Sequence, residues 1–166
     1  MCIRDRSQGY ANANAIDQQR ADLAIAFLIN RVNASGANAF QAYQDGADLM
    51  ALSLYWRTGG PDQVGSLTAI NKIYDRIAGN QLPSGYWCYS PGSLCDDSST
   101  TQLVMAGLAG ARGVFLANGD AARAAGLDQL TLNTRNAYAA NGVPGGAGLN
   151  DPEERGHGYR AGMGAN

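Results

Sequence analysis

The spacing of apolar side chains along the chain predicts five helices and no strand. In each predicted helix, apolar residues recur every three or four positions, as they do on one face of a helix. The predicted helices cover residues 15–32, 46–58, 62–79, 99–119 and 120–141. Apolar and polar residues nowhere alternate over five positions, so the pattern predicts an all-α fold.

Each predicted helix carries an apolar stripe that we expect to pack against other helices. In the first helix the stripe contains Leu23, Ala24, Phe27 and Leu28. The other stripes follow helix by helix: in 46–58 they are Leu49, Leu52, Leu54 and Trp56, and in 62–79 Val64, Leu67, Ile70, Ile73, Tyr74 and Ile77. In 99–119 they are Leu103, Val104, Leu108 and Phe115, and in 120–141 Leu127, Leu130, Leu132 and Tyr138. A set of aromatic residues either packs in the core or lines a lumen: Tyr43, Tyr55, Trp56, Tyr74, Tyr86, Trp87 and Tyr89.

The predicted helices recur in pairs. Residues 48–60 align with residues 102–114, and each of these segments is followed by a Pro-Asp or Gly-Asp turn and a longer helix. A recurring helix pair buries its apolar face against neighbouring pairs, so several pairs are needed for stability. We therefore expect the chain to form part of a larger closed or curved array.

The two ends of the sequence depart from this pattern. Residues 1–6, Met-Cys-Ile-Arg-Asp-Arg, fit no predicted helix, and we interpret them as a translated adapter remnant outside the domain. Residues 156–159, a glycine-aromatic stretch of the kind that precedes a helix elsewhere in the chain, lie directly before the C-terminal end. We therefore expect residues 7–166 to be an incomplete repeat domain that is truncated at its C-terminal end.

The segment from Gln81 to Trp87 has the pattern Gln-x-x-x-Gly-x-Trp, with Gly85 as its glycine. It resembles the QW repeat of squalene–hopene cyclases, in the terpenoid cyclase and protein prenyltransferase superfamily. The resemblance implies an α/α toroid, in which inner helices are ringed by outer helices. The glutamine can satisfy backbone groups at a helix end, and the glycine permits a sharp reversal. We therefore interpret Gln81, Gly85 and Trp87 as structural residues.

Asp96 and Asp97 are the candidate catalytic residues. Squalene–hopene cyclases, which the chain resembles, protonate an alkene with an Asp-x-Asp-Asp motif, but Leu94 stands where the first aspartate would be. The alternative, which we favour, is that Asp97 caps the helix that follows. Ser99 and Gln102 are expected to form a capping box at the start of that helix.

The prenyltransferase branch of the superfamily holds zinc with an Asp, a Cys and a His. The sole histidine is His157, and the chain has no Asp-x-Cys, so we expect no metal site and no cofactor. Cys88 and Cys95 lie in one loop, where they either form a disulfide or stay free thiols. A disulfide would favour an oxidising compartment, which gives a slight preference for an exported protein.

Composition excludes further classes of function. Charged residues make up 16% of the chain and Lys72 is the sole lysine, so we expect no nucleic-acid partner. No apolar run approaches the roughly 20 residues that span a bilayer.

The favoured hypothesis is a non-catalytic repeat protein that binds a hydrophobic, polyprenyl-type ligand or a protein partner. The alternative is a terpenoid cyclase that starts a carbocation cyclisation with an acid, with its catalytic motif partly outside this chain. A more distant one is a glycosidase that uses Asp45 and Asp48, or Asp96 and Asp97, as paired carboxylates.

Overall fold

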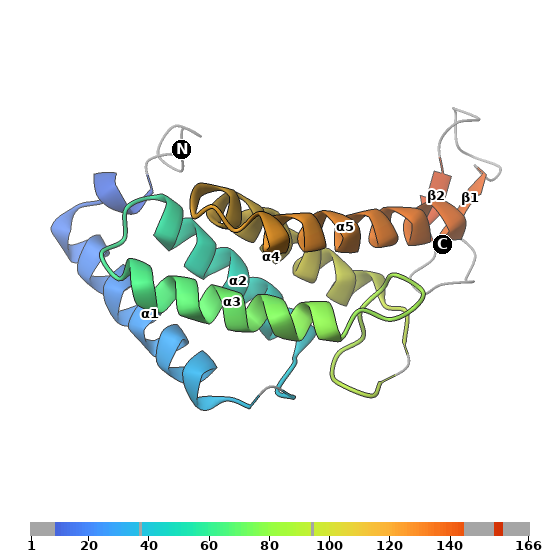
Figure 1. Cartoon of the computed structure of the whole chain (residues 1–166), viewed down its shortest axis with the longest axis horizontal. Coiled ribbons are helices and arrows are strands. Elements are labelled where there is room, and N and C mark those ends of the chain that lie inside the picture. Colours follow the sequence, from blue (N-terminus) through green and yellow to red (C-terminus); the bar gives the residue numbers. More distant parts are fainter. Residues whose placement is uncertain (1–8, 37, 94, 145–154, 158–166) are drawn as a thin grey trace.

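The computed structural model describes residues 9–36, 38–93, 95–144 and 155–157, and within them it is built from helices (Figure 1). A 3-10 turn, η2 (Tyr10–Asn12), directly precedes the first long helix. The long helices are α1 (Ala15–Ala34), α2 (Ala42–Arg57), α3 (Gln63–Gly79), α4 (Ser98–Ala117) and α5 (Ala121–Asn141). The predicted all-α class is therefore confirmed. The interpretation of residues 1–6 lies outside the described residues, as does the C-terminal end.

One feature of secondary structure departs from the prediction. Strands β1 (Gly142–Pro144) and β2 (Arg155–His157) pair in an antiparallel ladder that follows α5. Each strand has three residues, which is too short for an alternating pattern to be recognised in the sequence. The prediction that no strand forms is wrong at this point, but the pair adds only a short ribbon to the end of a helical structure.

Helices α2 and α4 lie closer together than any other pair. A Cβ atom on Gly46 would lie 2.6 Å from the carbonyl oxygen of Leu103, and one on Gly110 would lie 3.2 Å from the Cβ of Ser53. Because these contacts advance in the same direction along both helices, α2 and α4 run parallel. Gly107 completes the close approach, since its Cβ would lie 2.5 Å from the carbonyl oxygen of Gly46.

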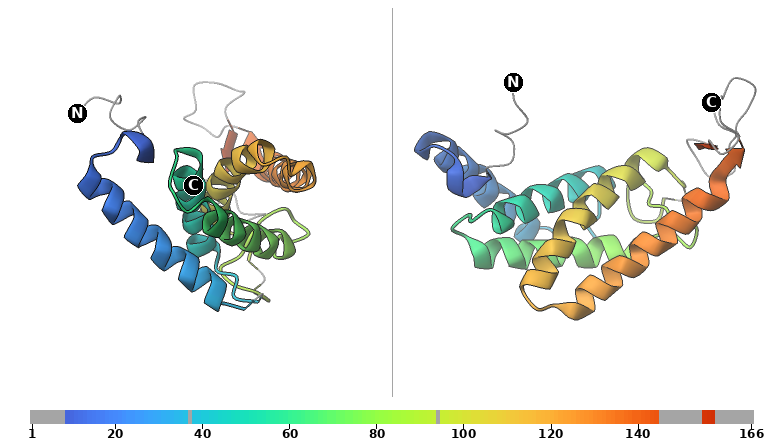
Figure 2. Two further views of the ribbon diagram at one scale, coloured as in Figure 1. Left: turned by 60° about the vertical axis from the view of Figure 1, so that its left-hand side comes forward. Right: turned by 90° about the horizontal axis from the view of Figure 1, so that it is seen from above.

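Helices α1, α3 and α5 lie around this central pair. Figure 2 shows α1 and α5 on opposite sides of α2 and α3. Lys72 of α3 donates to the carbonyl oxygen of Asn33 in α1 at 3.0 Å, and Asp75 of α3 forms an ion pair with Arg123 of α5 at 3.4 Å. Helix α3 therefore contacts both α1 and α5, so that alternate helices along the chain lie beside one another.

The helix boundaries differ from the prediction at two starts. Helix α2 begins at Ala42 and includes Gly46, because this glycine is needed for contact with α4 and does not mark a helix end. Helix α4 begins at Ser98 with Asp97 as its N-cap, so the predicted capping box of Ser99 and Gln102 is wrong. Ser99 lies in the first turn and Gln102 is exposed, because the carboxylate of Asp97 already occupies the first free backbone N–H groups.

The buried core confirms the predicted stripes of α3 and α4 at most positions and contradicts that of α1. Helix α1 buries Ile25, Ile29 and Val32, whereas Leu23 is 67% exposed and Phe27 is 63% exposed. This helix is apolar on two faces. The predicted stripe followed one of them, whereas α2 and α3 cover the other, which carries Ile25, Ile29 and Val32. Further predicted stripe residues that are exposed are Leu54, Val64 and Leu132.

Candidate functional site

The side chain of Gln81 joins the loop after α3 to the middle of α5. Its Nε2 donates to the carbonyl oxygen of Leu130 at 3.0 Å and to that of Gly85 at 3.2 Å. Its Oε1 accepts from Nδ2 of Asn133 at 2.9 Å. These partners lie within α5 and in the loop itself, so Gln81 connects the two helix pairs. The motif predicted that Gln81 would satisfy backbone groups at a helix end, and the structure shows that it does not.

Trp87 holds the end of α3 against the start of α4. Its ring is fully buried, and its Nε1 donates to the carbonyl oxygen of Ile77 in the last turn of α3 at 2.8 Å. Its backbone N–H donates to Oγ1 of Thr101 in α4 at 3.0 Å. At Gly85 the backbone has a φ of +89°, and a Cβ there would lie 2.6 Å from the carbonyl oxygen of Asn133. The motif residues therefore form a junction between helices, and Gln81 and Gly85 also line an open hollow of about 670 Å³ between the loop and α5.

Asp96 and Asp97 have different partners, although they are adjacent in the chain. Oδ1 of Asp97 accepts from the backbone N–H groups of Ser99 at 2.9 Å and Thr100 at 3.1 Å, and the side chain is fully buried. Asp96 is partly exposed and accepts a hydrogen bond from Ser84. Backbone N–H donors favour the ionised form of a carboxylate, which is the opposite of what a proton donor needs. The geometry of Asp97 therefore favours a cap.

Cys88 and Cys95 form a disulfide, with their Cα atoms 5.1 Å apart. The bond closes a small ring in the loop that carries Asp97 to the start of α4. In the chain-entropy account, a ring of this size stabilises the folded state by about 2–3 kcal/mol. Of the two alternatives for these cysteines, the structure therefore shows the disulfide.

A buried charged cluster lies where the C-terminal ends of α1 and α3 meet the start of α2. Arg76 pairs with Asp45 at 2.9 Å, and both side chains are almost completely buried. Arg31 pairs with Asp48 one turn further along α2. The four side chains line a pocket of about 270 Å³. Asp45 and Asp48, which the glycosidase alternative takes as a catalytic pair, each bind a different arginine, and this arrangement favours a role in holding three helices together.

The charged cluster makes stability depend on pH. Burial raises the pKa of Asp45 to about 6, because the loss of water outweighs the hydrogen bond from the Gln41 N–H and the charge of Arg76. The folded state then binds more protons than the unfolded state between about pH 4 and pH 6. We expect the free energy of unfolding to fall by about 2–3 kcal/mol as pH rises through this window.

Urea denaturation of the wild type and of Asp45→Asn at several pH values measures this effect as a difference between two chains. Carboxylates remote from Asp45 titrate equally in both chains, so the wild type should lose more stability than the variant as pH rises from 4 to 7. Parallel pH profiles would show that Asp45 titrates normally.

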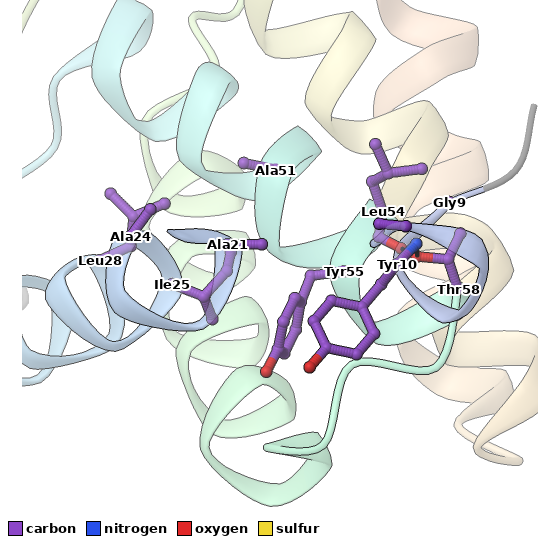
Figure 3. A pocket seen from close by; sticks show the side chains of 11 residues that line it. Gly9, Tyr10, Ala21, Ala24, Ile25, Leu28, Ala51, Leu54, Tyr55 and Thr58 are labelled. Atoms are coloured by element: carbon purple, nitrogen blue, oxygen red, sulfur yellow. Dashed lines mark hydrogen bonds between the residues drawn. The ribbon is translucent and has the colours of Figure 1, made fainter. Parts of the chain in front are cut away.

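An apolar pocket of about 400 Å³ lies between α1 and α2 (Figure 3). Helix α1 contributes Ala21, Ala24 and Leu28 to its wall, and α2 contributes Ala51 and Leu54. The pocket exists because three alanines occupy positions where larger side chains would fill the space between the helices. Such a concave, mainly apolar surface with a few polar groups is typical of a small-molecule site.

Two tyrosines close one end of the apolar pocket. The rings of Tyr10 and Tyr55 meet edge to face with centroids 5.1 Å apart, and Figure 3 shows their hydroxyl groups at the same edge of the pocket. Both hydroxyls donate to the carboxylate of Asp22, at 3.0 Å and 2.8 Å. Burial and the hydrogen bond to Asp22 raise the pKa of Tyr55 to about 12, so the tyrosine remains a donor at neutral pH.

The sequence prediction missed this pocket, although Tyr55 was among the candidates for a lumen. The signal was present as two apolar faces on one helix: Ile25 and Ile29 on the buried face, and Ala24 and Leu28 on the pocket side. The role of Tyr10 could not be read from the sequence, because it depends on how the turn before α1 folds back onto Thr58 at the end of α2.

No protein-family model, curated protein or solved structure matches the chain. Among the residues that the structure describes, no group of His, Cys, Asp and Glu side chains is arranged to hold a metal ion. Within the same residues, every helix is too short or too polar to cross a membrane.

Proposed function

We propose that the chain is part of an α/α toroid that binds a hydrophobic ligand in the pocket between α1 and α2, without catalysis. The toroid proposal is supported by the order of the helices. Helices α2 and α4, the first members of the two recurring pairs, run parallel and in contact, as the inner helices of such a toroid would. Helix α3 contacts α1 and α5 on either side, as an outer helix would.

The single observation that carries the ligand proposal is the chemistry of the pocket wall. Apart from Tyr10, Tyr55 and Thr58, the side chains that form it belong to alanine, leucine and isoleucine, and the wall contains no Asp, Glu, Lys, Arg or His. The exposed surface of α2 continues this apolar character through Tyr43, Met50 and Leu54, which lie on one face of the helix. A polyprenyl chain would bury this surface and its own, and the burial of apolar area would drive binding.

The cyclase alternative finds less support. An acid-initiated cyclisation needs a protonated carboxyl group beside the substrate, but Asp97 caps α4 and is absent from the pocket wall. The Cys88–Cys95 disulfide supports an oxidising compartment as part of the same proposal.

Binding of the fifteen-carbon prenol farnesol, measured by equilibrium dialysis, tests the proposed function. We expect saturable binding to the wild type, and binding at least about tenfold weaker to Ala51→Trp, because the new ring fills the pocket. Ala122→Trp, at an exposed position on α5, is the matched control and should bind farnesol like the wild type.

Thermal unfolding followed by circular dichroism establishes that both variants fold. Absence of saturable binding to the wild type would refute the ligand proposal. Equal affinity of wild type and folded Ala51→Trp would place the ligand elsewhere on the chain.

A further inference from the structure

A second hollow adjoins the apolar pocket at its tyrosine end. It has a volume of about 510 Å³ and shares Ile25 and Tyr55 with the apolar pocket. Its wall also contains Asp22 from α1 and Asp62, the N-cap of α3. A ligand that extends from one hollow into the other therefore passes from an apolar wall to one with two carboxylates.

The two carboxylates of this second hollow lack a cationic partner among the described residues. Most aspartates on the helices or directly before them form an ion pair with an arginine: Asp17, Asp45, Asp48, Asp75, Asp120 and Asp128. Asp22 instead accepts from the two tyrosine hydroxyls, and Asp62 accepts from the backbone N–H of Gly65 at 2.8 Å. These neutral donors hold the carboxylates in place and leave their negative charge uncompensated.

The tyrosine pair adds a second feature that favours a cation. Both tyrosines direct their hydroxyl groups at Asp22, so the hydroxyl oxygens add partial negative charge beside the carboxylate. Tyr10 and Tyr55 stand between the apolar wall and Asp22, at the point where a chain and a head group would join. An anionic head group would instead be repelled by both carboxylates, and a neutral one would gain nothing from their charge.

We propose that the ligand is a cationic amphiphile, with its apolar chain between α1 and α2 and an ammonium head group beside Asp22, Asp62 and the tyrosine pair. This inference rests on the proposed function, because it takes the apolar pocket as the site of the chain. It assigns a chemical class to the head group, which the apolar wall alone does not determine.

Three decyl probes that differ only in the charge of the head group test the inference: decyltrimethylammonium, decanol and decyl sulfate, each below its critical micelle concentration. Isothermal titration calorimetry on the full chain should give an affinity for decyltrimethylammonium at least about tenfold above that for decanol, and the weakest binding for decyl sulfate. The preference for the cation should shrink as salt is raised, because the carboxylates are partly exposed to solvent.

Two variants assign the preference to the carboxylates. Asp62→Asn keeps an N-cap residue on α3 and removes one charge, and Asp22→Asn removes the other. Each should lower the affinity for decyltrimethylammonium several-fold, and by a larger factor than it lowers the affinity for decanol. Asp128→Asn, on α5 away from both hollows, is the matched control and should change neither affinity.

The outcomes separate the two proposals. Binding of all three probes with similar affinity would overturn the cationic head group and leave the apolar pocket intact. Failure of every probe to bind would overturn the proposed function itself. A preference for the cation that survives in both Asp22→Asn and Asp62→Asn would also overturn the inference, because other residues would then bind the ammonium head group.

Discussion

Replacing Trp87 with alanine is expected to lower the free energy of unfolding by about 3–5 kcal/mol. The ring is fully buried between α3 and α4, so its removal leaves a cavity in the junction. The carbonyl oxygen of Ile77 also loses the hydrogen bond from the indole Nε1, at a cost of about 1 kcal/mol that is included in this range. Urea denaturation at neutral pH, followed by circular dichroism, measures the change.

Trp56→Ala is the matched control, because Trp56 lies on α2 and is only partly buried. We expect it to be clearly less destabilising than Trp87→Ala. Trp87→Phe separates packing from hydrogen bonding, since the ring volume is largely kept and the Nε1 donor is lost. A loss of stability below about 1 kcal/mol in Trp87→Ala would contradict the view of Trp87 as the centre of the junction.

Replacing Arg76 with methionine is expected to cost about 3–5 kcal/mol at pH 7.5, because it leaves the carboxylate of Asp45 buried without its cation. The cost should be smaller at pH 5, where Asp45, with a pKa of about 6 in the wild type, takes up a proton and becomes neutral. Urea denaturation at the two pH values measures both effects.

The double variant with Asp45→Asn and Arg76→Met tests the cause. With both charges removed, it should be more stable at pH 7.5 than Arg76→Met alone. Arg112→Met is a control for the loss of an arginine, because the pair of Arg112 and Asp128 is half exposed and should contribute less than about 1 kcal/mol. A double variant no more stable than Arg76→Met would show that the arginine stabilises the chain by packing instead of charge.

The helices could be predicted from the sequence because their patterns are local. The five predicted segments all became helices, and those of α1, α3, α4 and α5 agree with the structure to within two residues at each end. The errors arose where a residue serves a distant contact. Gly46 was taken as a helix start, although it lies inside α2 so that α4 can approach its backbone. The N-cap of α4 was placed two residues late, because Ser99 and Gln102 fit a capping box that Asp97 makes unnecessary.

The pocket could not be predicted for a related reason. Periodicity identifies apolar faces, but it does not say which of two apolar faces on α1 packs against the core. The sequence placed Leu23 and Phe27 inside, and the structure places them outside. The meeting of Tyr10, Asp22 and Tyr55 joins three separate segments of the chain, so no local pattern contains it.

Photoaffinity labelling with a farnesol analogue that carries a diazirine at the chain tests the central claim most directly. After irradiation and proteolysis, mass spectrometry should find the label in residues 21–28 of α1 and 51–58 of α2, which line the apolar pocket. Unlabelled farnesol should displace it, and Ala51→Trp should prevent it. Labels on the exposed face of α5, or labels that farnesol does not displace, would contradict a ligand site between α1 and α2.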